Sequence, residues 1–81
     1  MPKAQHSSSY RFVPRVLRAM RERAELTQRQ LGKKLKKPQS WVYNCETANR
    51  RVDVVEFMDW CIACRENPTK ALQRLRKARG I

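Results

Sequence analysis

Apolar residues recur along this chain at spacings of three and four, which is typical of helices with one buried face. In the first such segment they fall at Val13, Val16, Leu17, Met20 and Ala24. Pro14 fits only the first turn of a helix, where its missing N–H costs no hydrogen bond. The pattern therefore predicts a first helix over about residues 13–24.

Two short helices are predicted between residues 27 and 47. Thr27 and Gln30 have the spacing of a capping box, in which each side chain satisfies the other residue's backbone N–H. Two leucines at helical spacing follow them. Pro38 then marks a break and is expected in the first turn of a third helix over residues 39–46. The sequence thus predicts two helices joined by a short turn.

Two more helix starts follow. Asp53 and Glu56 repeat the capping-box spacing, and Asn67-Pro68 places a capping side chain before a proline. The stripe expected to be buried in the fourth helix consists of Val54, Phe57, Cys61 and Cys64, with Met58 and Trp60 beside it. The inner face expected in the last helix consists of Ala71, Leu72 and Leu75. No alternating pattern or Asn-Gly hairpin signal occurs, so the sequence predicts an all-α fold.

Charge is distributed unevenly over the 81 residues. Lys and Arg total 19 against 7 Asp and Glu, a net charge of +12. Residues 1–37 are strongly basic, residues 53–66 are acidic, and residues 70–79 carry no acid at all. An excess of this size favours an anionic polymer as partner, either nucleic acid or an anionic membrane.

The remaining composition narrows the class of protein. No apolar run reaches the roughly 20 residues that span a bilayer, and the N-terminus lacks the apolar core of a signal peptide. Three cysteines make no even disulfide framework, so we expect a cytoplasmic, nucleoid-associated protein. We expect residues 1–10 to form a disordered polar arm, residues 11–79 a single domain with the helix-turn-helix at about 27–47, and residues 80–81 the C-terminal end.

The residues of the two short helices carry a resemblance to a known family. The run Leu26-Thr27-Gln28-Arg29-Gln30-Leu31, followed by Leu35, Pro38-Gln39-Ser40, Val42, Glu46 and Arg50-Arg51, resembles the lambda-repressor-like helix-turn-helix of the xenobiotic-response-element (XRE) family. Asp53-Val54-Val55-Glu56-Phe57 is similar to one common subgroup. The resemblance implies a five-helix transcriptional regulator, bacterial or phage-derived, that binds a palindromic operator as a homodimer.

The resemblance also implies roles for single residues. Gln28 lies where the family contacts phosphate, and Gln39 lies where it packs on that residue and reads base edges. Ser40 and Asn44 occupy groove-facing positions. Arg21 and Glu46 match a buried ion pair of the family that joins the first helix to the third.

Three positions depart from the family. Lys36 replaces the usual glycine of the turn, so either Lys36 is left-handed or the turn differs. Ala48 replaces glycine after the recognition helix, so that helix is expected to run on by one or two residues. Tyr43 replaces the family's usual serine, and its ring is a candidate to stack on a sugar or to touch a thymine methyl.

The chemistry of base reading supports these assignments independently. Gln and Asn amides pair with adenine through a donor and an acceptor side by side, and Ser serves either role. The predicted base-reading residues are Gln39, Ser40, Asn44 and Tyr43. The predicted phosphate contacts are Gln28, Arg29, Lys34, Lys36, Lys37, Arg50 and Arg51, with Lys33 as a further candidate.

Other interpretations stay open at this stage. Trp41 either contacts DNA or packs along the edge of the domain. Cys61 and Cys64 are better explained as core thiols than as ligands, because a zinc site needs four ligands and only Cys45 and His6 remain. The sequence shows no catalytic set and predicts neither a metal nor a cofactor. The rival functions are an antitoxin or phage-type accessory protein with a small protein partner, and a nucleic-acid or membrane binder driven by charge alone.

Overall fold

The computed structural model describes residues 8–81, and this part of the chain folds into five α-helices with no strand. The helices are α1 (Phe12–Arg23), α2 (Gln28–Leu35), α3 (Gln39–Glu46), α4 (Val54–Ala63) and α5 (Pro68–Ala78). The predicted all-α, five-helix fold is confirmed. Among the described residues, no helix has both the length and the apolar character needed to cross a membrane.

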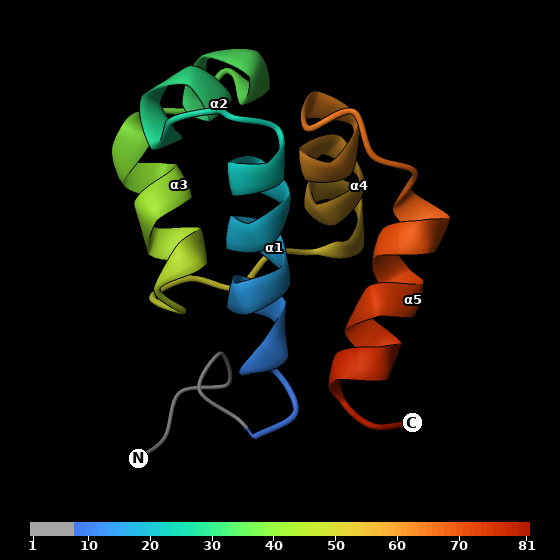
Figure 1. Ribbon diagram of the computed structural model, residues 1–81. Helices are drawn as coiled ribbons and strands as arrows, with labels where there is room; N and C mark the ends of the chain where they lie inside the picture. The colour runs from blue at the N-terminus through green and yellow to red at the C-terminus, as the bar shows by residue number, and fades with distance from the viewer. Residues whose placement is uncertain (1–7) are drawn as a thin grey trace.

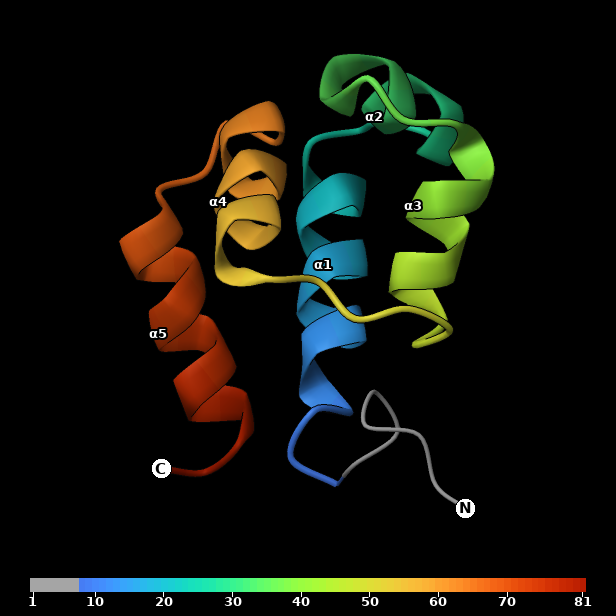
Figure 2. The same ribbon diagram turned by 180° about the vertical axis from the view of Figure 1, so that it is seen from behind.

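Helix α1 is the centre of the arrangement. It packs against α3 and α5, which lie on its two opposite sides in both views (Figures 1 and 2). Helix α2 packs against α3 and α4, and α4 also packs against α5. The α2–α3 pair therefore lies at one side of the molecule and α5 at the other.

The helix starts follow from local side-chain chemistry. Thr27 Oγ1 accepts from the Gln30 N–H at 3.0 Å, and Gln30 Oε1 accepts from the Thr27 N–H at 2.9 Å. The Asp53–Glu56 pair repeats this reciprocal arrangement, so both predicted capping boxes are confirmed. Pro38 is the N-cap of α3 and not part of its first turn, because its ψ of 159° is extended.

The core joins residues that are far apart in the sequence. Leu17, Met20, Leu31 and Val42 are fully buried together with Trp60, whose Nε1–H donates to the Leu17 carbonyl at 3.0 Å. The buried face of α4 differs from the predicted stripe in two ways. Val54 is 73% exposed and Trp60 is fully buried.

On α5, Leu72 was likewise expected on the inner face and is 58% exposed, whereas Ala71 is fully buried. Helical spacing allows more than one apolar face, and neighbouring helices decide which is covered. Val54 and Leu72 instead line a shared surface hollow with Val13 and Phe57.

Tyr10 belongs to the packed domain, although it was expected in the N-terminal arm. It is 6% exposed, and its hydroxyl oxygen accepts from the Val52 N–H at 3.0 Å. Arg51 lies over its ring, 4.5 Å from the centroid. Tyr10 thus fixes the segment before α1 to the loop between α3 and α4. The rest of the expected arm, residues 1–7, lies outside the described residues.

The turn between α2 and α3 depends on Lys36, whose backbone is left-handed, and on Gly32, which is buried within α2. Lys36 has a φ of 58° and a ψ of 42°, the left-handed alternative that the sequence left open. A Cβ on Gly32 would lie 2.6 Å from the Lys37 carbonyl oxygen, and the Lys37 N–H donates to the Gly32 carbonyl at 2.8 Å. The turn closes this tightly over α2 because residue 32 has no side chain.

Helix α3 ends earlier than expected. Its last residue is Glu46, and Ala48 adopts a φ of 64° in place of continuing the helix. The Asn44 carbonyl accepts from the N–H groups of Asn49 and Arg50 at 2.9 and 3.1 Å, which closes the end of the helix. The expectation that α3 runs past Glu46 is therefore wrong, because these bonds force Ala48 into the conformation that glycine usually adopts.

Candidate nucleic-acid interface

An ion pair whose side chains are largely shielded from solvent joins α1 to the end of α3. Arg21 Nε and Nη2 donate to the two carboxylate oxygens of Glu46 at 2.6 and 3.0 Å, and Arg21 Nη1 donates to the Leu26 carbonyl at 2.8 Å. The side chains are 12% and 3% exposed. The bond to Glu46 raises the pKa of the Arg21 guanidinium above its ordinary value. This pair fixes the position of α3 on the body of the domain.

The ion pair continues as a chain of amides toward the surface. Gln28 Nε2 donates to Glu46 Oε1 at 3.1 Å, and Gln39 Nε2 donates to Gln28 Oε1 at 3.4 Å. Glu46 and Gln28 are partly buried, whereas Gln39 is exposed at the first turn of α3. The side chain of Gln39 is therefore held in place through Gln28, not left to move freely.

Four polar side chains share the outer face of α3. They stand at positions i, i+1, i+4 and i+5 of one helix, a spacing that places them on one side of it. They are Gln39, Ser40, Tyr43 and Asn44. Gln39, Ser40 and Tyr43 are exposed, and Asn44 is partly buried, with its Oδ1 3.5 Å from Asn49 Nδ2. All four predicted base-reading residues thus lie together.

Trp41 lies beside this face and packs on the domain. Its ring centroid is 6.2 Å from that of Trp60, and the cationic groups of Lys37 and Arg50 lie 5.3 and 4.9 Å from it. The geometry supports packing along the domain edge as the role of Trp41. It also gathers two predicted phosphate contacts, one from each end of α3, around one aromatic ring.

Arg50 is bound within the protein. Its Nη1 donates to Glu56 Oε1 at 3.2 Å, and this bond raises the pKa of the guanidinium. The same Glu56 oxygen accepts the Asp53 N–H in the capping box of α4. Arg50 therefore links the end of α3 to the start of α4 and is less free to reach a phosphate than its position in the sequence indicates.

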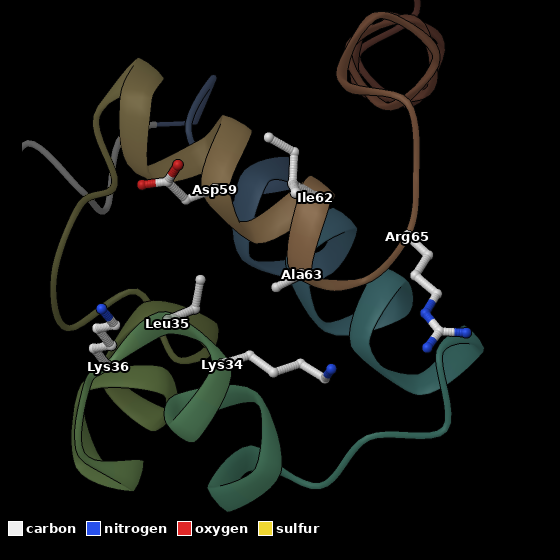
Figure 3. A pocket seen from close by; sticks show the side chains of 7 residues that line it. All are labelled: Lys34, Leu35, Lys36, Asp59, Ile62, Ala63 and Arg65. Atoms are coloured by element: carbon white, nitrogen blue, oxygen red, sulfur yellow. The ribbon is translucent and has the colours of Figure 1, made fainter.

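Two other predicted phosphate contacts lie beside α4. Lys34 and Lys36 line a hollow of about 340 Å³ between α2 and α4, together with Asp59, Ile62 and Arg65 (Figure 3). The structure therefore does not bring all the predicted phosphate contacts together. They form three groups. The ends of α3 are flanked by Lys37, Arg50 and Arg51, and the start of α2 contains Gln28 and Arg29. The hollow beside α4 is lined by Lys34 and Lys36.

The cysteines are core residues. Cys45 and Cys61 are fully buried and Cys64 is 4% exposed. Burial raises the pKa of Cys61 and of Cys64 to about 11, so both thiols are protonated at neutral pH. Within residues 8–81 no three His, Cys, Asp or Glu side chains form a cluster that would hold a metal ion. His6, the remaining ligand considered, lies outside the described residues.

The sequence did not predict two contacts of the site, Gln28 with Glu46 and Lys37 with Trp41. The bond from Gln28 to Glu46 crosses 18 residues and leaves no local signal. The contact of Lys37 with Trp41 leaves no helical signal either, because Lys37 precedes the extended N-cap Pro38 and is not part of α3.

The chain is similar to known helix-turn-helix proteins. A family model described as a helix-turn-helix domain matches residues 15–65. The solved structure of an XRE-family like protein from Pseudomonas syringae pv. tomato str. DC3000 is 37% identical in sequence, with a TM-score of 0.81 over 90% of this chain and 89% of that one. No curated protein sequence matches. Together with the geometry of α2 and α3, these matches show that the chain belongs to the XRE-like helix-turn-helix family of DNA-binding regulators.

Proposed function

We propose that the protein is a transcriptional repressor that places α3 in the major groove of a palindromic operator and binds it as a homodimer. The observation that carries the proposal is the polar outer face of α3, whose Gln39 is held by Gln28. Gln39 and Asn44 read adenine edges, and Ser40 and Tyr43 contact neighbouring bases. An amide held in place before binding loses less conformational freedom on contact with a base.

Phosphate contacts position α3 in the groove. Gln28 and Arg29 contact one strand from the start of α2, and Lys37 and Arg51 contact the backbone from the two ends of α3. Lys34 and Lys36 add positive charge from the end of α2, and Arg50 acts mainly by holding the α3–α4 loop. Each direct phosphate contact adds about 0.9 to the slope of log affinity against log salt concentration.

Selection from a random duplex library tests the readout. The unaltered protein is expected to select a palindrome whose half-sites lie about one helical turn apart. Gln39→Ala is expected to lose base preference at one position of each half-site, with affinity for the selected operator about 5- to 100-fold lower. Gln73→Ala, a glutamine on α5, serves as the matched control and should select the same sequence. An unchanged selection by Gln39→Ala refutes the assignment.

The exposed face of α4 is the proposed dimer contact. Val55, Met58 and Ile62 lie at i, i+3 and i+7, and they are 61%, 45% and 62% exposed. An exposed apolar stripe of this kind is typical of protein interfaces. In sedimentation velocity with operator DNA, Val55→Ser/Ile62→Ser should bind as a monomer, while Leu72→Ser should still bind as a dimer. Dimeric binding by both variants would rule out this surface.

The same α4 face supports a second candidate function, an antitoxin or accessory protein whose partner is a different protein. Co-purification from the native host distinguishes the two. A stoichiometric partner that is lost from Val55→Ser/Ile62→Ser, with a monomeric chain in its absence, favours the second candidate. A homodimer without any other partner favours the repressor.

A further inference from the structure

Helix α5 carries a basic surface that the proposed operator contact does not use. From Asn67 to Ile81 the chain contains no acidic residue. The exposed cations of this segment are Lys70, Arg74, Arg76, Lys77 and Arg79. They supply five of the positive charges behind the net charge of +12. Lys70, Arg74 and Lys77 share one side of the helix and define the α5 basic face, and Arg76 and Arg79 flank it.

The α5 basic face lies on the far side of the domain from α3. Helices α3 and α5 flank α1 on opposite sides in both views (Figures 1 and 2). Helix α4, which packs beside α5, exposes the acidic residues Asp53 at its N-cap and Asp59. A straight duplex in contact with α3 therefore leaves α5 facing away from it.

Most of these cations are not neutralised within the protein. Arg74 pairs with Glu66, and Arg76 Nε donates to the Ile81 carbonyl at 3.0 Å. Lys70, Lys77 and Arg79 make no ion pair with any other described residue. Their charge is available to an external anion.

The cations of α5 lie beside two hollows of its surface. Two shallow hollows of about 300 and 280 Å³ run along the helix, the first lined by Lys70, Gln73, Arg74 and Lys77 and the second by Gln73, Arg76, Lys77 and Ile81. Lys70 and Lys77 are seven residues apart on one face, about 10 Å along a helix axis. Two cations at this separation can each contact a different phosphate of the same duplex.

We propose that the α5 basic face binds the backbone of a second DNA duplex, so that one molecule joins two DNA segments. The inference rests on the proposed binding of the first duplex through α3. Binding to a membrane is disfavoured, because helices that lie in a bilayer surface carry a broad apolar face and α5 exposes only Leu72 among its large apolar residues. DNA next to a bound operator is also present at high effective concentration.

Capture of a second duplex tests the proposal. The selected operator is immobilised, the protein is bound to it, and a fluorescent duplex of unrelated sequence is added at about 50 mM salt. Lys70→Gln/Lys77→Gln should capture the second duplex at least fivefold less than the unaltered protein. Its salt slope should fall by about 2, because two phosphate contacts are lost. Arg15→Gln/Arg18→Gln removes the same charge from exposed positions of α1 and should capture normally.

Two further measurements fix the interpretation. Affinity for a single operator should be equal in the two variants, and a selective loss in Lys70→Gln/Lys77→Gln would overturn the proposal by placing α5 in the operator contact. Undiminished capture of the second duplex by Lys70→Gln/Lys77→Gln would also overturn the proposal. The two α3 helices of a dimer could then join the two duplexes without α5.

Vesicles of anionic phospholipid test the alternative that the α5 basic face binds a membrane. Binding that depends on Lys70 and Lys77, without capture of a second duplex, would overturn the assignment to DNA. If no operator is selected, the proposed repressor function fails, yet capture between two duplexes of random sequence still tests α5 independently.

Discussion

Arg21 donates from Nε and Nη2 to both carboxylate oxygens of Glu46, at 2.6 and 3.0 Å, across 25 residues of sequence. The pair joins α1 to the end of α3. Glu46 also accepts from Gln28, which in turn accepts from Gln39. These hydrogen bonds connect the ion pair to the first residue of α3. The position of the outer face of α3 and the stability of the fold therefore depend on the same bonds.

Arg21→Ala should lower the free energy of unfolding by about 3 kcal/mol, because it leaves the carboxylate of Glu46 buried without its cation. Arg18→Ala is the matched control, since Arg18 pairs with Glu22 where the side chains are 64% and 56% exposed. Its cost should stay below about 1 kcal/mol. Urea denaturation measures both, and similar losses in the two variants would contradict the role given to the buried pair.

Gly32→Ala should destabilise the protein although alanine favours helices by about 1 kcal/mol over glycine. The added Cβ would lie 2.6 Å from the backbone oxygen of Lys37, and a backbone atom in a tight turn has little room to move. Overpacking of this kind costs about 1–3 kcal/mol, and we expect the upper end here. A thermal midpoint equal to or above that of the unaltered protein would show that the turn relaxes freely.

Ala48→Gly should stabilise the protein by about 1 kcal/mol, because glycine adopts a left-handed backbone without the clash that alanine suffers there. The φ of Ala48 is 64°. The same substitution inside a helix has the opposite sign, so Ala19→Gly in α1 should cost about 1 kcal/mol. Chemical denaturation of the two variants side by side checks this, and a loss of stability in Ala48→Gly would be the contrary result.

The stabilising contribution of Glu66 should disappear in acid. Arg23 donates to it at 2.9 and 3.1 Å and Arg74 donates as well, and these bonds hold the pKa of the Glu66 carboxyl below its ordinary value of 4.5. A lowered pKa in the folded state stabilises the protein above the unfolded pKa, and this stabilisation is lost as the pH falls through the folded value.

The comparison of Glu66→Gln with the unaltered protein measures this contribution. The difference in thermal midpoint should be largest near pH 7 and should shrink steadily below pH 4.5. A difference that stays constant between pH 7 and pH 3 would show that the carboxylate charge does not matter to the contact.

The sequence by itself determined the features that depend on neighbours three or four residues away. The capping boxes at Thr27 and Asp53 form as predicted, because both partners of each bond lie in the same turn of helix. The five helices, their order and the family followed from the same short-range signals.

Only the tertiary structure decided which apolar face is covered and which cations are already bound. Trp60 is buried and donates to the Leu17 carbonyl of α1, whereas Val54 is exposed, because the helices packed on α4 cover one of its sides and helical spacing alone allows either. Arg50 is held by Glu56 and Trp41, and Tyr10 is held by Val52, through contacts with no fixed spacing in the sequence. Such contacts depend on how helices distant along the chain meet, so the sequence identified the two helices of the helix-turn-helix but not which cations around α3 are bound within the protein.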